Sequence, residues 1–190
     1  IEKYVPELGI YLDCRSNPVL DEDGKVVQIV EQLRDITERK RIEEALRDSE
    51  ELYRTLVEST PDAIIVLDTK RNITACNPGF STLFGYTEEE LRGRSVRVIH
   101  VSEEAFLSFG KTAYDAVERT GYYRGEVSYR KKSGDLISAE TVLSPVLKNG
   151  TVTGYVGVIR DITERKEYEE QLKYLSLHDQ LDRKSTRLNS

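Results

Sequence analysis

The chain has 190 residues, of which 38% are hydrophobic and 33% charged, and its formal net charge is −6 at pH 7. This composition can bury a core, whereas the acidic balance disfavours non-specific binding to nucleic acid, which needs a basic surface. Two cysteines, Cys14 and Cys76, give neither a disulfide framework nor a CxxC metal spacing, and they fit a reducing setting.

The sequence begins with Ile1 and contains no Met, which indicates an internal piece of a longer protein. No apolar run approaches the ~20 residues that a bilayer-spanning helix needs. We therefore expect a cytoplasmic fragment without membrane contact, while a membrane anchor further upstream in the parent protein stays open.

The heptapeptide RDITERK occurs twice, at residues 34–40 and 160–166, which are 160 − 34 = 126 positions apart. The preceding segments DGKVVQIVEQL and NGTVTGYVGVI align without a gap, and a PVL triplet recurs one residue out of that register. Asp-Gly and Asn-Gly favour tight hairpin turns, so each copy predicts strand, turn, strand and helix. Residues 1–35 are thus expected to be the C-terminal strands of a truncated first module.

The junction from strand to helix has the spacing of a capping box. Asp35 and Asp161 stand three residues before Glu38 and Glu164. An N-cap carboxylate accepts backbone N–H groups and complements the helix dipole. The sequence therefore predicts that both aspartates are N-caps.

Residues 36–58 are expected to form an amphipathic helix that connects the two modules. Its apolar seam has the 4-3-4-3 spacing of a heptad repeat. The seam comprises Ile42, Leu46, Ser49, Tyr53 and Leu56, and the second copy starts a seam with Tyr168, Leu172 and Leu175. A helix packed on its own domain fits so short a seam as well. We favour a coiled coil, and hence a homodimer through the linker helices, because the helix joins two modules.

The complete module is expected over residues 51–163. AIIVLD and ITAC predict a hairpin, and two short helices follow, one after the N-cap Asn77 and one with a capping box of Thr87 and Glu90. A longer helix after Ser102 and three further strands complete the module. The predicted fold is α+β: a five-stranded antiparallel sheet with small helices on one face, flanked by amphipathic signalling helices.

This module closely resembles the PAS sensor domain, through YRTLVESTPDAIIVLD, ITACNPGFSTLFGYTEEELRG, YYRGEVSYRKKSGD and the terminal RDITERK. The resemblance implies that the Asp-x-Thr step at the end of the last strand passes motion from the sheet to the following helix. The expected signal-transfer joint comprises Arg160, Asp161 and Thr163, with Arg34, Asp35 and Thr37 as counterparts in the tail of a preceding PAS domain.

PAS domains are often receptors, which makes His100 and the cysteines candidate cofactor ligands. Haem sensors of the family use a histidine on the long helix, whereas His100 precedes that helix, so we expect a surface or loop histidine. Cys14 lies in a predicted strand, unlike the cysteine of flavin photoreceptors, and Cys76 is interpreted as a small buried hydrophobic residue. No haem, flavin or metal is predicted, the ligand is unknown, and no catalytic set is visible.

Residues 162–181 are expected to contain an output linker helix and the start of an output domain. QLKYLSLHDQL resembles the lead-in to a diguanylate cyclase (GGDEF) domain, and the matching positions are Leu172, Leu175, Asp179 and Leu181. Residues 182–190 depart from that family and are interpreted as a non-native tail. Because no Gly-Gly-Asp/Glu-Glu-Phe motif is present, cyclase activity is expected in a covalently linked neighbour.

Two alternatives stay open for the output. His178 beside Asp179 would be the phosphoacceptor of a sensor histidine kinase, although Asp182 stands where such sites carry Thr or Asn. The module would otherwise be a non-enzymatic dimerisation scaffold. A metal-dependent phosphohydrolase is excluded, because a lone His-Asp pair lacks the further ligands that a metal needs.

Overall fold

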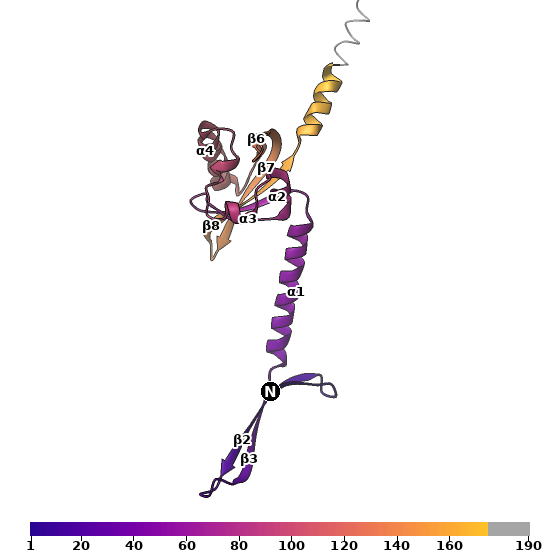
Figure 1. Cartoon of the computed structure of the whole chain (residues 1–190), viewed down its shortest axis with the longest axis vertical. Coiled ribbons are helices and arrows are strands. Elements are labelled where there is room, and N and C mark those ends of the chain that lie inside the picture. The colour runs from indigo at the N-terminus through magenta and orange to yellow at the C-terminus, as the bar shows by residue number, and fades with distance from the viewer. Residues whose placement is uncertain (175–190) are drawn as a thin grey trace, which may run out of the picture. The chain divides into compact units, whose positions relative to one another are not determined.

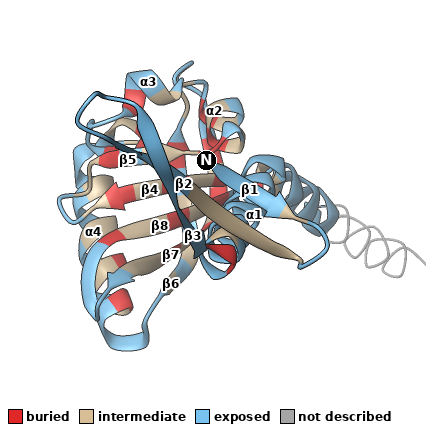
Figure 2. Cartoon of the chain, turned by 90° about the horizontal axis from the view of Figure 1, so that it is seen from below, coloured by how far each residue is buried: buried red, intermediate tan, exposed pale blue. Residues whose placement is uncertain are grey.

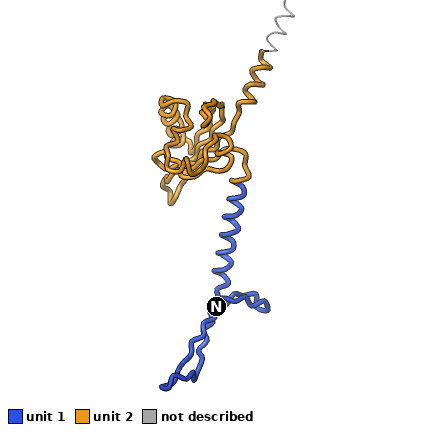
Figure 3. Tube along the Cα trace, viewed as in Figure 1, with its two compact units in different colours: residues 1–56 blue, residues 57–190 orange. Residues whose placement is uncertain are grey.

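The computed structural model describes residues 1–174, which belong to two compact units. Unit 1 comprises residues 1–56 and unit 2 begins at residue 57 (Figure 3). Each unit has its own antiparallel sheet, and each sheet leads directly into a helix.

Unit 1 contains a three-stranded sheet in the order β1-β2-β3. Its strands are β1 (Glu2–Val5), β2 (Ile10–Leu20) and β3 (Val26–Asp35). The tight turn between β2 and β3 is closed by the Asp21 carboxylate, which accepts the N–H groups of Asp23 and Lys25. Gly24 in this turn has a φ of +78°, a conformation that glycine adopts without strain.

Helix α1 (Thr37–Ser59) follows β3 and carries the predicted apolar seam. The side chains of Ile42, Leu46 and Tyr53 in this seam are each more than half exposed. An apolar stripe on a helix that has no core of its own to cover needs a partner or remains in water.

Unit 2, whose helices are labelled in Figure 1, contains the predicted five-stranded antiparallel sheet. Its strands follow the order β5-β4-β8-β7-β6, as Figure 2 shows. The strands are β4 (Ala63–Asp68), β5 (Ile73–Cys76), β6 (Tyr123–Arg130), β7 (Leu136–Lys148) and β8 (Thr151–Asp161). The last strand, β8, therefore lies in the centre of the sheet and pairs with both β4 and β7.

Four helices lie between β5 and β6. They are α2 (Pro78–Phe84), α3 (Glu88–Leu91), the 3-10 helix η1 (Val96–Ile99) and α4 (Glu103–Thr120). Three of them, α2, α3 and α4, begin at the predicted caps, whereas the short 3-10 helix η1 was not predicted. Asn77 and Ser102 accept the N–H of the residue three positions on, and Thr87 forms a complete capping box with Glu90. These short-range patterns are confirmed because each cap depends only on residues within one turn.

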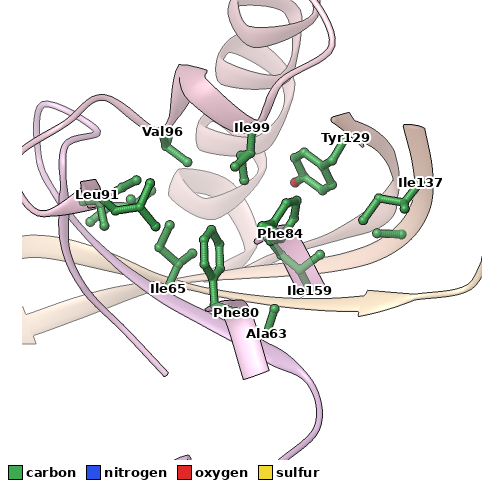
Figure 4. Close-up of a cluster of buried hydrophobic side chains, with 13 residues drawn as sticks. Ala63, Ile65, Phe80, Phe84, Leu91, Val96, Ile99, Tyr129, Ile137 and Ile159 are labelled. Atoms are coloured by element: carbon green, nitrogen blue, oxygen red, sulfur yellow. The ribbon is translucent and has the colours of Figure 1, made fainter. Parts of the chain in front are cut away.

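One face of the five-stranded sheet is packed against these helices. Alternate residues of β4 are buried, as the period of a strand requires, and the buried positions of this unit are red in Figure 2. Phe80 and Phe84 from α2 are fully buried, with ring centres 4.5 Å apart, and they lie near Ile65 and Tyr129 in Figure 4. The helices and the sheet therefore share one hydrophobic core.

Candidate functional site: the strand-to-helix joint

The first joint links β3, β2 and α1 through one threonine. The carboxylate Oδ1 of Asp35, the last residue of β3, accepts the N–H of Thr37 at 2.9 Å and its hydroxyl at 2.5 Å. The Thr37 oxygen in turn accepts the N–H of Tyr11 on β2, at 2.8 Å. The N–H of Ile36 donates to the Tyr11 carbonyl at 2.9 Å, so the first residues of the helix are fixed to the neighbouring strand.

The second joint repeats this arrangement in unit 2. Asp161 Oδ1 accepts the N–H of Thr163 at 2.9 Å, and the Thr163 oxygen accepts the N–H of Ser138 on β7 at 3.0 Å. The N–H of Ile162 donates to the Ser138 carbonyl at 2.9 Å, and the helix starts at Thr163. Ile36 and Ile162, the middle residues of the two triplets, are both buried. The two joints differ in one bond: the Thr37 hydroxyl donates to Asp35, whereas the Thr163 hydroxyl donates to the Ser138 carbonyl at 3.4 Å. The other contacts described for the aspartate, isoleucine and threonine are the same in both joints.

The predicted N-cap role of the aspartates is wrong in its detail. Each carboxylate accepts the N–H of the residue two positions on, Thr37 or Thr163, rather than that of the glutamate three positions on. The reason is that the strands extend through the aspartates, since Asp35 pairs with Leu12 and Asp161 with Ala139. Each aspartate therefore closes an Asx-type turn from strand to helix.

Two ion pairs reinforce the joints from a third strand. Lys40 Nζ lies 2.5 Å from the Glu2 carboxylate on β1, and Lys166 pairs in the same way with Glu126 on β6. The sequence did not indicate this contact, because the distance in sequence from the glutamate to the joint threonine differs (37 − 2 = 35 and 163 − 126 = 37). The lysine that occurs in both copies of RDITERK was the only feature of the repeat that could have indicated these ion pairs.

Hydrogen bonds shift the pKa values of three charged groups in the two joints. The hydrogen bond from the Thr37 hydroxyl holds the pKa of Asp35 below its usual value, and the hydrogen bond from Lys166 does the same for Glu126. The bond to Glu2 raises the pKa of Lys40. Asp35 and Glu126 are exposed and Lys40 is partly exposed, so salt screens their interactions. These contacts therefore orient the side chains more than they raise the free energy of unfolding.

Arg160 forms an ion pair that has no counterpart in unit 1, within the described residues 1–174. Its guanidinium binds the carboxylate of Asp62, the residue before β4, with Nε–Oδ1 at 3.0 Å and Nη2–Oδ2 at 2.6 Å. Arg34, its counterpart, has no ion pair in the same part of the chain. The Asn77 side-chain amide donates to the carbonyls of Asp62 and Val57, both at 3.0 Å. The end of β8 is thereby connected to the segment through which the chain enters the domain.

His100 is not the surface histidine that we expected. It lies in a loop, between η1 and α4, but only 6% of it is exposed, and its ring packs against Phe106, Phe109 and Tyr129. Burial lowers its pKa to about 4, with a smaller effect from the charge of Arg71. The loop position was visible in the sequence, whereas the enclosure depends on how the following helix α4 packs and on Tyr129 of the distant strand β6.

Within the described residues, no cluster of three His, Cys, Asp or Glu side chains has a geometry that could hold a metal ion. In the same range no helix combines the length and the hydropathy that crossing a membrane requires. Leu175, His178, Asp179, Leu181 and the predicted tail 182–190 lie outside the described residues.

Sheet order, helices and joint together define a sensor-type α+β domain whose central last strand leads into a helix. The family model described as PAS domain matches residues 8–38 and 61–164, and the chain belongs to this family. A solved PAS domain from Colwellia psychrerythraea has the same fold, with a TM-score of 0.57 and 30% identity over 60% of this chain and 97% of that one.

Curated relatives are multidomain signalling proteins. The probable diguanylate cyclase DgcE of Escherichia coli K12 is 28% identical over 173 residues, which cover 90% of this chain and 16% of DgcE. The sensor histidine kinase TmoS of Ectopseudomonas mendocina is 27% identical over 169 residues, covering 86% of this chain and 17% of TmoS. The chain thus spans about a sixth of the length of each relative.

Proposed function

We propose that the chain is the sensory part of a cytoplasmic signalling protein and that its second joint transmits the signal. In this proposal a change in the PAS sheet reaches the helix that begins at Thr163, and through it a C-terminal output domain. The observation that supports the proposal is the duplicated joint, in which Asp, Ile, Thr and Lys make corresponding contacts in two separate sheets, apart from the acceptor of the threonine hydroxyl.

The mechanism follows from what the first helical turn touches. Thr163 is bonded to β7 through Ser138, Lys166 to β6 through Glu126, and Asp161 belongs to β8 itself. A relative displacement of these strands therefore rotates or tilts the helix start. The signal acts as a population shift between two arrangements, and a ligand produces it only if it binds them with unequal affinity.

The output arrangement is proposed to be a homodimer through the linker helices. The exposed seam of α1 has heptad spacing, and the polar residues around it suit a coiled coil that presents its apolar side to a second copy. Leu46→Glu places a charge in that seam and should convert a dimer to a monomer in light scattering. Arg47→Glu, which changes a charge on the neighbouring exposed position, is the matched control. A wild-type monomer would contradict the dimer.

The output domain is proposed to be a diguanylate cyclase. The relative DgcE supports this choice, together with the spacing of the leucines in residues 171–181. The second candidate, favoured by the relative TmoS, is a histidine kinase that is phosphorylated on His178. No nucleic-acid partner is proposed for either.

Sequencing the parent gene past Leu181, where the proposed non-native tail begins, separates the two candidates. A Gly-Gly-Asp/Glu-Glu-Phe motif within roughly the next 100 residues, the length of one domain, supports the cyclase. A kinase ATP-binding domain would overturn it, and His178→Gln should then abolish autophosphorylation. If neither follows, the module is a scaffold without an enzymatic output.

A further inference from the structure

The turn between β4 and β5 holds an arginine in an unfavourable backbone conformation. Arg71 has a φ of +67°, in the left-handed region that residues with a Cβ rarely adopt. Its side chain is turned inward: the guanidinium carbon lies 3.6 Å from the centre of the Phe106 ring, and Nη2 donates to the Phe106 carbonyl at 3.1 Å. Such strain persists where the surrounding structure imposes it, often at binding sites.

This half-buried cation has no counterion in the described part of the chain. No carboxylate there forms an ion pair with Arg71, and the acid of its own turn, Asp68, is already engaged. Asp68 accepts the N–H groups of Lys70 and Asn72 at 2.8 and 2.7 Å and the Asn72 amide at 2.9 Å. Removing a charge from water without an opposite charge is costly, so the site favours an anion from outside.

Three buried polar atoms around the guanidinium lack a hydrogen-bond partner. They are Arg71 Nε, His100 Nδ1 and the Tyr114 hydroxyl. The guanidinium carbon is 5.2 Å from the centre of the Tyr114 ring, and the ring centres of His100 and Phe106 are 5.4 Å apart. All three atoms can donate, the imidazole when its proton is on Nδ1. Donors beside a cation are the complement of a carboxylate.

Helix α4 is shaped around this arginine. Phe106, Gly110 and Tyr114 are four residues apart and so lie on one face of the helix. A Cβ at position 110 would lie 2.4 Å from Arg71 Nη1, which means that a side chain there would displace the guanidinium. Glycine lowers the stability of a helix interior, and here its absence of a side chain leaves the space that Arg71 occupies.

We propose that Arg71, His100 and Tyr114 form the binding site of a short-chain monocarboxylate. The carboxylate would take the three free donors, and its alkyl end would meet the aromatic rings that surround His100. This inference names a ligand class for the proposed sensor and therefore rests on that function. It makes no use of the joint, and its residues are separate from Asp161 and Thr163.

Thermal unfolding and calorimetry of the full 190-residue chain with acetate and propionate test the site. Both should raise the melting temperature as their concentration rises, whereas the neutral isostere acetamide should not. Tyr114→Phe should weaken acetate binding by about tenfold, the effect of losing one hydrogen bond to a charged group. Equal effects of acetate, acetamide and chloride would overturn the proposal.

Arg71→Gly is the decisive variant, because glycine accepts the positive φ and the fold should be retained. It should abolish acetate binding. Asn149→Gly relieves the same kind of strain, at a φ of +52° in the β7–β8 turn, and should bind acetate like the wild type. Unchanged binding in Arg71→Gly would refute the site. Thr163→Val should leave acetate binding intact, so failure of the site and failure of the transmission proposal give different results.

Discussion

Arg160 and Asp62 are 98 residues apart in the chain, and their side chains form a two-pronged ion pair with Nη2 and Oδ2 at 2.6 Å. The pair connects the end of the central strand β8 to the residue before β4. Both the entry and the exit of the PAS domain are therefore attached to one position of the sheet. The proposed transmission needs such a connection between the two ends of the domain.

Asp62→Asn should remove a small contribution that depends on pH. The hydrogen bond from Arg160, and then its charge, hold the pKa of Asp62 below its ordinary value of 3.8. For an acid with a lowered folded-state pKa, the stabilisation is complete above the unfolded value and is lost as the pH falls below 3.8 towards the folded value. Partial exposure of the pair limits the contribution to about 0.5 kcal/mol at pH 7.

Urea unfolding at pH 6 and pH 3 measures this difference. The wild type should exceed Asp62→Asn at pH 6, and the gap should be narrower at pH 3, below the unfolded pKa of 3.8. Glu88→Gln, which removes an exposed i,i+4 pair with Arg92 in α3, is a control away from β8. A gap as wide at pH 3 as at pH 6 would mean that the carboxylate contributes through packing instead.

Thr163→Val should weaken the joint, because valine has nearly the same size as threonine but lacks the hydroxyl group. The valine removes the oxygen that accepts the Ser138 N–H, and a part-buried backbone donor without a partner costs about 1–2 kcal/mol. Hydrogen exchange at the Ser138 amide should accelerate together with the loss of stability. Thr153→Val, which removes an exposed bond to the Val146 carbonyl, should leave that amide unaffected. Protection of Ser138 in both variants would show that the hydroxyl is not needed.

Gly154→Ala should separate β8 from β4. A Cβ at this buried position would lie 2.3 Å from the Leu67 carbonyl oxygen, and the backbone cannot yield without shifting the strand pair. Overpacking of this kind costs about 1–3 kcal/mol. Gly125→Ala meets the tip of the Tyr123 side chain at the same distance, and that side chain can rotate away. Thermal unfolding should therefore show a larger loss for position 154, and equal losses would contradict this explanation.

His100 should make stability depend on pH in a window where few groups titrate. Burial lowers its pKa from 6.5 to about 4. Between these values the unfolded chain binds a proton that the folded chain does not, so the free energy of unfolding falls as the pH falls, by roughly 3 kcal/mol in total. Urea unfolding between pH 6.5 and 4.5 should show this slope in the wild type and in His178→Gln. His100→Gln should flatten it, and an unchanged slope would refute the assignment.

The sequence predicted those features that depend on neighbouring residues. The Asn77 cap and the Thr87–Glu90 capping box are formed within one helical turn, and strand alternation is visible over a few residues. The two repeats also indicated where each sheet ends. These features are local, and therefore periodicity and capping preferences were sufficient to place them.

The contacts that define the joint could not be predicted in this way, because they depend on strand order and register. Arg160 meets Asp62 only because β8 is inserted beside β4, and Lys166 meets Glu126 across two strands. The aspartate of the joint was assigned to the helix because nothing in its spacing shows that Asp161 still pairs with Ala139. Burial of His100 likewise arises from rings on α4 and β6.

The transmission role of the joint is tested most directly by the basal output of the parent protein. Asp161→Ala should cost about 1 kcal/mol of stability, because it removes one side-chain bond to a backbone N–H, and Thr163→Val somewhat more. Thr87→Ala removes a comparable side-chain bond to a backbone N–H, the N-cap of α3, away from the joint. Both joint variants should change output activity by about fivefold or more, the scale of an allosteric coupling, while Thr87→Ala should not. If all three variants lose stability and retain wild-type output, the joint is a structural turn and the account of transmission is wrong.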